Sequence, residues 1–246
     1  MADRNNNDLV IGRNAVSESL RSGRLMDKVL VAKGNRSGSI GKIIAICREK
    51  HIVVKEVDSK KLDFMCGNMN HQGVIAIAAA CEYSTLDDIF ALAEQRDEKP
   101  FIVICDEIED PHNLGAIIRT AECAGAHGVV IPKRHGAGLT SIVGKTSAGA
   151  IEHIPVARVG NITSALEALK ERGVWIYGAD MNGEDYRKTD FSGAVGLVVG
   201  SEGAGIGRLV KDNCDFLVSI PMSGRISSLN ASVAAGILMY EVARGR

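Results

Sequence analysis

Three segments rich in glycine and polar residues each follow an apolar run that is typical of a buried β-strand. They are residues 110–119 (DPHNLGAIIR), 200–207 (GSEGAGIG) and 220–230 (IPMSGRISSLN). In α/β proteins, ligands bind at the carboxyl ends of parallel strands, where the loops that follow neighbouring strands meet. The sequence therefore predicts one site built from these three segments.

The first segment contributes Asn113 and Arg119. Asn113 can cap the helix that follows, because its side chain can accept hydrogen bonds from free backbone N–H groups. Arg119 stands in an otherwise apolar helix, where an unpaired charge is costly. We expect Arg119 either to contact an anion or a ribose, or to form a salt bridge or lie at the surface.

The other two segments contribute Glu202, Ser228 and Asn230. Glu202 lies in a run of four glycines, where it could orient Arg119, bind a ligand hydroxyl, or face the N-terminus of a helix. Ser228 and Asn230 precede a long predicted helix, and either can cap it. The pattern Ser-Ser-x-Asn-x-Ser offers more hydrogen-bonding capacity than one cap requires.

The common nucleotide and metal motifs are absent from the sequence. A G-x-G-x-x-G pattern starting at Gly203 fails because Arg208 stands where the third glycine should be, and the Gly-Lys-Thr at 144–146 lacks the leading glycine of a phosphate loop. The histidines show no i, i+4 pair and the cysteines no C-x-x-C pair, so we expect no metal site.

The elements that would position these side chains fall into two parts. Residues 1–80 predict a small α/β domain, with a helix capped by Asn14, and residues 81–99 predict a linker that carries a short amphipathic helix. From residue 100 to 246, continuous Val/Ile/Leu runs alternate with amphipathic helices, which indicates a parallel sheet covered on both faces. The strands expected there are 101–105, 128–131, 154–156, 174–179, 194–199 and 216–220, and the helices 114–126, 141–149, 162–172, 206–213 and 229–244.

Composition excludes a disordered chain, since 46% of the 246 residues are hydrophobic and 24% are charged. The net charge of −1 conceals an asymmetry: residues 1–80 hold 13 Lys and Arg against 8 Asp and Glu, and the remainder holds 16 against 22. A basic N-terminal part is typical of a module that faces a polyanion. The candidate contacts are Arg13, Arg21, Arg24, Lys33 and Arg36.

We expect a cytoplasmic protein without a membrane span. The longest uncharged stretch near the C-terminus, 227–240, is too short to cross a bilayer. The first eight residues lack the basic and then apolar pattern of a signal peptide.

Together, the three segments resemble the motifs of the SpoU (TrmH-like) RNA ribose 2′-O-methyltransferases of the SPOUT superfamily. The resemblance rests on residues 113–119, on residues 197–205, and on residues 220–224 together with 228–241. It covers the chain from about Pro100 to the end. In the third motif, Ala231 stands where the family normally has valine or a similar residue. Residues 11–16 (IGRNAV) and 71–74 (HQGV) resemble the substrate-binding domain of members that act on 23S rRNA. The segments 131–135 (IPKRH) and 145–150 (KTSAGA) are most similar to those of the 23S rRNA guanosine 2′-O-methyltransferases.

The resemblance implies a C-terminal SPOUT-type α/β domain with a deep trefoil knot, and an N-terminal L30e-like domain that binds RNA. It implies S-adenosylmethionine as methyl donor, without a metal, and a homodimer with active sites near the subunit interface. Backbone groups of Gly200, Ile220 and Leu229 would hold the cofactor. The catalytic set would be Arg119, Asn113, Glu202, Ser228 and Asn230.

By the same resemblance, the substrate would be a guanosine ribose in 23S rRNA. A tRNA ribose methyltransferase and a non-catalytic RNA-binding protein of ribosome assembly are the alternatives. The eighty-residue N-terminal domain favours rRNA, because the tRNA enzymes of the family usually carry short basic extensions. Arg119 would act at the 2′-hydroxyl; a guanidinium is a poor base, so orienting a phosphate and stabilising the developing alkoxide is the easier role.

Overall fold

The computed structural model describes residues 8–35, 38–67 and 69–246. The contacts between residues divide the chain into two units. One unit contains the residues up to Glu82 together with Leu139–Ser141, and the other contains Tyr83–Gly138 and Ile142–Arg246. The first seven residues, on which the signal-peptide expectation rests, and Arg36 lie outside the described residues.

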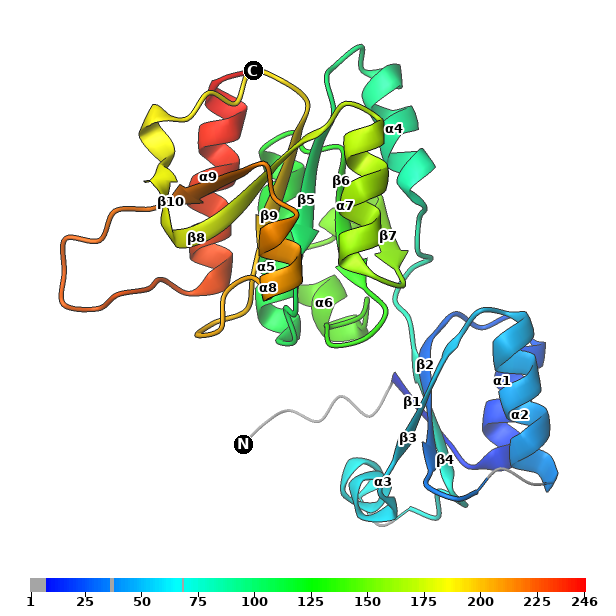
Figure 1. Cartoon of the computed structure of the whole chain (residues 1–246). Helices are drawn as coiled ribbons and strands as arrows, with labels where there is room; N and C mark the ends of the chain where they lie inside the picture. Colours follow the sequence, from blue (N-terminus) through cyan, green and yellow to red (C-terminus); the bar gives the residue numbers. More distant parts are fainter. Residues whose placement is uncertain (1–7, 36–37, 68) are drawn as a thin grey trace. The chain divides into compact units, whose positions relative to one another are not determined.

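The first unit is a mixed sheet with helices on both faces (Figure 1). Its strand order is β1-β4-β2-β3, in which β2 and β3 are parallel and β4 is antiparallel to both its neighbours. Helices α1 and α2 bury apolar side chains against one face, and α3 buries Leu62 and Cys66 against the other. The elements are β1 (Leu9–Ile11), α1 (Arg13–Arg21), β2 (Met26–Ala32), α2 (Gly38–Glu49), β3 (Val53–Val57), α3 (Ser59–Cys66) and β4 (Val74–Ala78).

The start of α1 differs from the prediction. The residue before the helix is Gly12, which has a φ of 90°, and no side chain caps the helix. The prediction that Asn14 is the cap is therefore wrong, because Asn14 already lies inside the first turn. Strand β1, which spans only 3 residues, was not predicted because so short a run carries no periodicity.

The second unit is built on a six-stranded sheet of order β10-β8-β9-β5-β6-β7. All of its strand pairs are parallel, which confirms the predicted parallel sheet. The strands are β5 (Phe101–Cys105), β6 (Gly128–Pro132), β7 (Val156–Val159), β8 (Trp175–Asp185), β9 (Val195–Val199) and β10 (Phe216–Ser219). Every residue of β5, β6 and β9 is buried, which explains their continuous apolar sequences.

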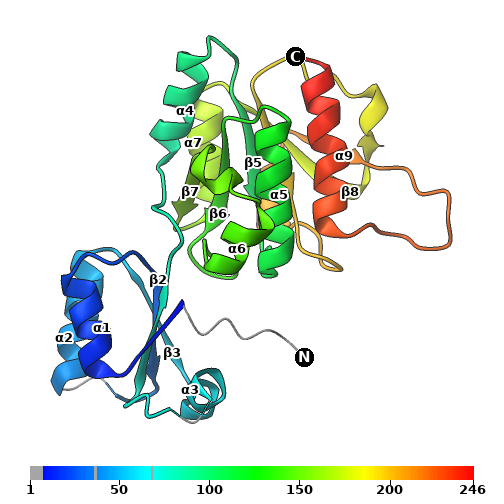
Figure 2. The same cartoon turned by 180° about the vertical axis from the view of Figure 1, so that it is seen from behind.

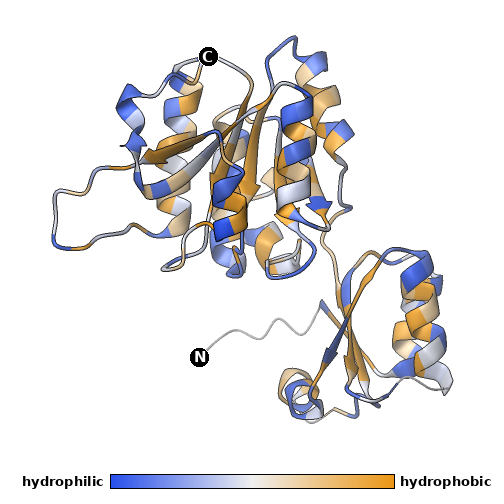
Figure 3. Ribbon diagram, viewed as in Figure 1, coloured by the Kyte–Doolittle hydropathy of each residue, from blue (hydrophilic) through white to orange (hydrophobic). Residues whose placement is uncertain are grey.

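Helices cover both faces of this sheet. Figure 1 shows α4, α7 and α8 on the near face, and Figure 2 shows α5, α6 and α9 on the opposite face. The central strands β5, β6 and β9 are apolar, whereas the outer sides of the helices are largely polar (Figure 3). The helical elements are α4 (Leu86–Gln95), α5 (Pro111–Cys123), α6 (Ser141–Thr146), η2 (Ala150–Glu152), α7 (Ile162–Glu171), η3 (Tyr186–Lys188), α8 (Arg208–Asp212) and α9 (Ala231–Arg244).

Helix α4 lies within the segment 81–99, which the sequence predicts to be a linker. Thr85 and Asp88 form a capping box at its start, and Ile89 is fully buried in the core of the second unit. Residues 83–99 are thus part of the second unit.

Strand β8 continues six residues beyond its predicted end. Its pairing with β10 is interrupted by a shift of register between Leu217 and Val218, after which Val218 pairs with Glu184. Glycine is required at Gly183, because a Cβ atom there would lie less than 3.0 Å from the backbone of Leu217. The bulge occupies residues 179–183 of β8, where the sequence turns polar and predicts a loop, so the sequence did not reveal the continued strand.

In the described part of the chain, no helix is long and apolar enough to span a bilayer. Within the same part, no group of three or more His, Cys, Asp or Glu side chains is arranged to hold a metal ion.

Candidate functional site

The predicted site lies where β5 and β9 run side by side. The chain passes from β5 through β6 to β7 on one side of the sheet and then returns to build β8, β9 and β10 on the other. Cys105 pairs with Val199, and the next residue, Asp106, donates its backbone N–H to Val199 O at 2.8 Å. This boundary is the topological switch point of the sheet, where open α/β folds bind ligands.

Three side chains far apart in the sequence meet at this edge and form what we call the polar cluster: Asn113, Glu202 and Asn230. Asn113 Nδ2 donates to Glu202 Oε1 at 3.0 Å, and Asn230 Nδ2 donates to Asn113 Oδ1 at 2.9 Å. Asn230 Nδ2 also donates to Glu202 Oε1, which accepts a further bond from the backbone N–H of Ala231 at 3.4 Å. The structure thus brings together three of the five predicted catalytic residues.

Capping by neighbouring residues explains why these amides can meet. Asp110 precedes Pro111 and caps α5 by accepting a bond from His112 N at 2.9 Å, so Asn113 is not the cap that one interpretation of the sequence expected. Asn230 caps α9 with Oδ1, which accepts from Ser232 N and Val233 N, and this leaves Nδ2 for the polar cluster.

The loop after β9 is closed upon itself. Ser201 and Gly205 exchange two backbone hydrogen bonds, of 3.0 and 2.9 Å. A Cβ atom at Gly200 would lie less than 3.0 Å from backbone atoms of Gly205 and Ile206, so only glycine fits there. The buried carboxylate of Asp106, which sequence analysis missed, anchors the end of the loop by accepting a bond from Gly207 N at 2.8 Å.

A cleft of about 410 Å³ adjoins the polar cluster. Acidic side chains are prominent in its lining, and Glu107 and Glu109 are exposed. The lining residues are Glu107, Ile108, Glu109, Asp110, Asn113, Ser201, Glu202 and Ala231. Such a cleft favours a ligand that carries positive charge.

Arg119 and Ser228 are not part of the polar cluster. Arg119 is exposed on α5, six residues beyond Asn113 and therefore roughly 9 Å further along the helix axis. It has no hydrogen-bond or ion-pair partner among the described residues, and Glu202 bonds to the two asparagines instead. Ser228 is exposed and likewise has no side-chain partner within the described ranges.

The segment between β10 and α9 is a long loop that extends outward (Figure 1, orange). It contains Ile220 and Leu229, and every residue from Pro221 to Asn230 is exposed. No backbone–backbone hydrogen bond joins residues 220–229 to any residue that the structure describes. Its N–H and C=O groups are therefore available to a ligand, although neither Ile220, Leu229 nor Gly200 lines the cleft beside the polar cluster.

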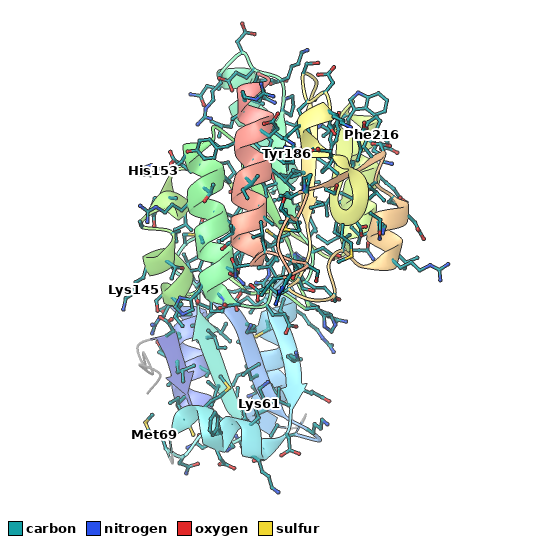
Figure 4. All side chains as sticks on the ribbon, turned by 90° about the vertical axis from the view of Figure 1, so that its left-hand side faces the viewer. Lys61, Met69, Lys145, His153, Tyr186 and Phe216 are labelled. Atoms are coloured by element: carbon teal, nitrogen blue, oxygen red, sulfur yellow. The ribbon has the colours of Figure 1, made fainter. Side chains whose placement is uncertain are left out.

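Helix α5 lies between α9 and η2 on its face of the sheet. Figure 4 shows α5 and α9 side by side, with His153 and Lys145 on the other side of α5. Glycine at position 115 permits the close packing of α5 against α6, since a Cβ atom there would overlap the side chain of Thr146. This packing fixes the helix that carries both Asn113 and Arg119.

Comparison with known proteins agrees with this fold. Residues 100–240 match the SpoU rRNA Methylase family, and residues 9–84 match the domain described as RNA 2′-O ribose methyltransferase substrate binding. The chain belongs to the SpoU methylase family. It is an S-adenosylmethionine-dependent RNA 2′-O-ribose methyltransferase of the SpoU/TrmH type.

Individual relatives cover nearly the whole chain. YacO of Bacillus subtilis (strain 168), assigned to the TrmH family of tRNA/rRNA methyltransferases, is 53% identical over 240 residues, which are 97% of this chain and 96% of YacO. The AdoMet-bound rRNA methyltransferase from Sinorhizobium meliloti is 28% identical, with a TM-score of 0.59, and the match covers 98% of this chain and 89% of that protein. The A. aeolicus TrmH/SpoU tRNA modifying enzyme is 30% identical, with a TM-score of 0.56, over 65% of this chain and 85% of that enzyme.

Proposed function

We propose that this enzyme methylates the 2′-hydroxyl of a guanosine ribose in 23S rRNA. The observation that carries the proposal is the extent of the structural matches. The rRNA methyltransferase from Sinorhizobium meliloti matches 98% of the chain, whereas the A. aeolicus tRNA modifying enzyme matches 65%. The similarity of residues 131–135 and 145–150 to the 23S rRNA guanosine enzymes supports the choice of guanosine.

The first unit supports an RNA substrate. Arg13 Nε donates to the carbonyl oxygen of Gln72 at 2.9 Å, and Gln72 Oε1 accepts from the Arg13 backbone N–H at 3.1 Å. The two motifs IGRNAV and HQGV therefore meet in the fold. No carboxylate among the described residues neutralises the Arg13 guanidinium, which leaves an oriented positive charge suited to a phosphate. We propose that this unit is L30e-like and binds the RNA.

The residues at the site fit the cofactor. When bound, S-adenosylmethionine would supply a methyl group on a positively charged sulfur: the ribose 2′-oxygen would bond to the methyl carbon as the carbon–sulfur bond breaks, and the hydroxyl proton would pass to solvent. Glu107, Glu109 and Glu202 would give the cleft a negative charge that suits such a cationic ligand, and the free backbone of 220–229 would provide hydrogen-bonding groups. In this proposal, Gly200, Ile220 and Leu229 hold the cofactor through their backbone, in a trefoil knot formed by the loops after β9 and β10.

The protein's main task is alignment, because the methyl donor is already activated. Orientation of two reactants can lower a barrier by roughly 7–11 kcal/mol. The polar cluster does this at the strand ends: Glu202 fixes the two asparagine amides, and its second carboxylate oxygen remains free for a ligand hydroxyl. Ser228 belongs to the exposed segment that would close on the ligands.

Arg119 completes the site in a proposed homodimer. Its side chain is exposed and takes no part in the cluster of its own chain, which suits contact with the ribose and phosphate bound by a second copy. Helix α9, which packs beside α5, exposes Val233 by 51% and Tyr240 by 55%, and these apolar side chains suit a subunit interface. The six cysteines are free thiols, in keeping with a cytoplasmic location.

Methyl transfer from labelled S-adenosylmethionine to 23S rRNA fragments and to bulk tRNA tests the substrate. We expect label in the 23S fragments, recovered as 2′-O-methylguanosine after digestion to nucleosides. Label in tRNA alone would replace the rRNA assignment with the tRNA alternative. Label in neither RNA would refute both assignments and point to another RNA as the substrate.

Arg119→Ala tests the catalytic assignment. We expect transfer to fall at least about 10²-fold, as for loss of a donor that stabilises an oxyanion. The melting temperature should not change, because the side chain is exposed. Arg96→Ala, at the end of α4, is the matched control and should retain wild-type activity; near-normal turnover of the Arg119 variant would show that the site is misplaced.

A further inference from the structure

A basic turn follows β6, next to the cleft. Its residues are Lys133, Arg134 and His135, all exposed. Because β6 pairs with β5 in parallel, this turn leaves the same edge of the sheet as the acidic loop 106–110. It stands one strand spacing from β5, roughly 5 Å, and so flanks the cleft.

The backbone of the basic turn is held in place from both sides. Lys133 N donates to Val159 O, and Ala137 N donates to Ile108 O, both at 2.8 Å. The second bond joins the turn directly to the loop that lines the cleft. His135 adopts a φ of 56°, in the left-handed region that non-glycine residues rarely occupy. The turn therefore presents its side chains from a fixed position.

The side chains of the basic turn are unpaired although carboxylates are close by in the chain fold. None of the three forms a hydrogen bond or ion pair with any residue in the described ranges, and the same holds for Glu107 and Glu109. Neighbouring loops of opposite charge that do not pair leave both charges available to ligands. The acidic loop faces the cleft, and the basic turn borders it.

We infer that Lys133, Arg134 and His135 bind the phosphates of the RNA strand that flank the nucleotide at the polar cluster. The inference rests on the proposed function, in that the substrate is RNA, but does not depend on which RNA. Lysine and arginine bind phosphate oxygens by charge-assisted hydrogen bonds, and neither residue reads base identity in such contacts. The basic turn would thus fix the register of the strand so that one ribose faces the methyl donor.

The test is the double variant K133Q/R134Q, measured with a 23S rRNA fragment and with bulk tRNA as binding probes. Each phosphate contact to a single strand contributes about 0.7 to the slope of log K against log salt. Loss of two contacts should therefore reduce that slope by about 1.4. The KM for RNA should rise, while the affinity for S-adenosylmethionine should stay at the wild-type value.

The matched control is R96Q/K99Q, which removes the same two charges just before β5, at the opposite edge of the sheet. This control should keep the wild-type salt slope. Equal slopes for the two double variants would overturn the inference, as would a loss of S-adenosylmethionine affinity without a loss of RNA affinity. If the wild type methylated tRNA but not 23S rRNA, the proposed substrate would be refuted. The salt slopes of the two double variants could still be compared with tRNA as the probe.

Discussion

Replacement of Gly200 by alanine tests how the loop after β9 is closed. The added Cβ atom would lie less than 3.0 Å from backbone atoms of Gly205 and Ile206. Real Cβ atoms do not approach backbone so closely, and backbone cannot rotate away as a side chain can. The loop must open to admit the methyl group.

The cost of opening follows from the bonds that the loop makes. Two hydrogen bonds join Ser201 and Gly205, and each contributes about 1 kcal/mol. Displacement of Gly207 would also weaken its bond to the Asp106 carboxylate, and a bond to a charged group contributes about 1.5–3 kcal/mol. We expect Gly200→Ala to lower the free energy of unfolding of the second unit by about 2–4 kcal/mol.

Urea unfolding followed by Trp175 fluorescence measures this loss, because Trp175 is the chain's single tryptophan and lies on β8 beside β9. Calorimetry with S-adenosylmethionine should show weaker binding in parallel. Gly160→Ala is the control: a Cβ atom there meets nothing within 4 Å, so its effect should stay within about 0.5 kcal/mol. A Gly200 variant as stable as the Gly160 variant, with unchanged cofactor affinity, would refute this account of the loop.

Two further predictions concern charged groups. Glu202→Ala should lower kcat by about 10²-fold, because Asn230 loses the carboxylate that holds its amide. Glu202→Gln should lower kcat much less, since its amide oxygen still accepts the same bonds. Equal losses of kcat in the two variants, measured at saturating RNA and cofactor, would contradict the alignment role. The His127 ring is buried and accepts a bond from Phe101 N, and burial, assisted by the charge of Arg246, lowers its pKa. The unfolded chain therefore binds a proton at His127 more readily than the folded chain, so the melting temperature should fall as the pH drops below about 6.5. His127→Gln should flatten this dependence of the melting temperature on pH. A variant with the same pH dependence as the wild type would contradict the prediction.

The strands of the second unit could be predicted because their sequences are determined by burial alone. Strand β5 has the predicted bounds, Phe101–Cys105, and β9 begins within one residue of its prediction. A strand covered on both faces must be apolar at every position, and a run of five such residues has few alternatives. Strand β8 was harder, because residues 179–183 bulge out of its pairing with β10 and its extension beyond them is polar.

The polar cluster was predicted in part. The position of each segment after a strand indicated a shared edge, and the resemblance supplied the set of five residues, of which the structure brings together Asn113, Glu202 and Asn230. The sequence left open whether Asn113 is a cap, because Asp110 and Asn113 can both cap a helix and only the bounds of α5 decide between them. Asp106 gave no signal, since a single acid after a strand is common.

Charge at this site explains why the net charge of the chain is a poor guide to its ligands. A cationic cofactor and a polyanionic RNA must meet within a few ångström, so one continuous field of either sign would repel one of them. The structure places carboxylates along the cleft and positive side chains on the adjoining turn, and among the described residues neither Glu107 and Glu109 nor the side chains of the turn have an internal partner. Because attraction between exposed charges is screened over roughly 8–10 Å at physiological salt, each ligand responds mainly to the charges next to it. A near-zero sum is therefore what two opposed binding surfaces should give.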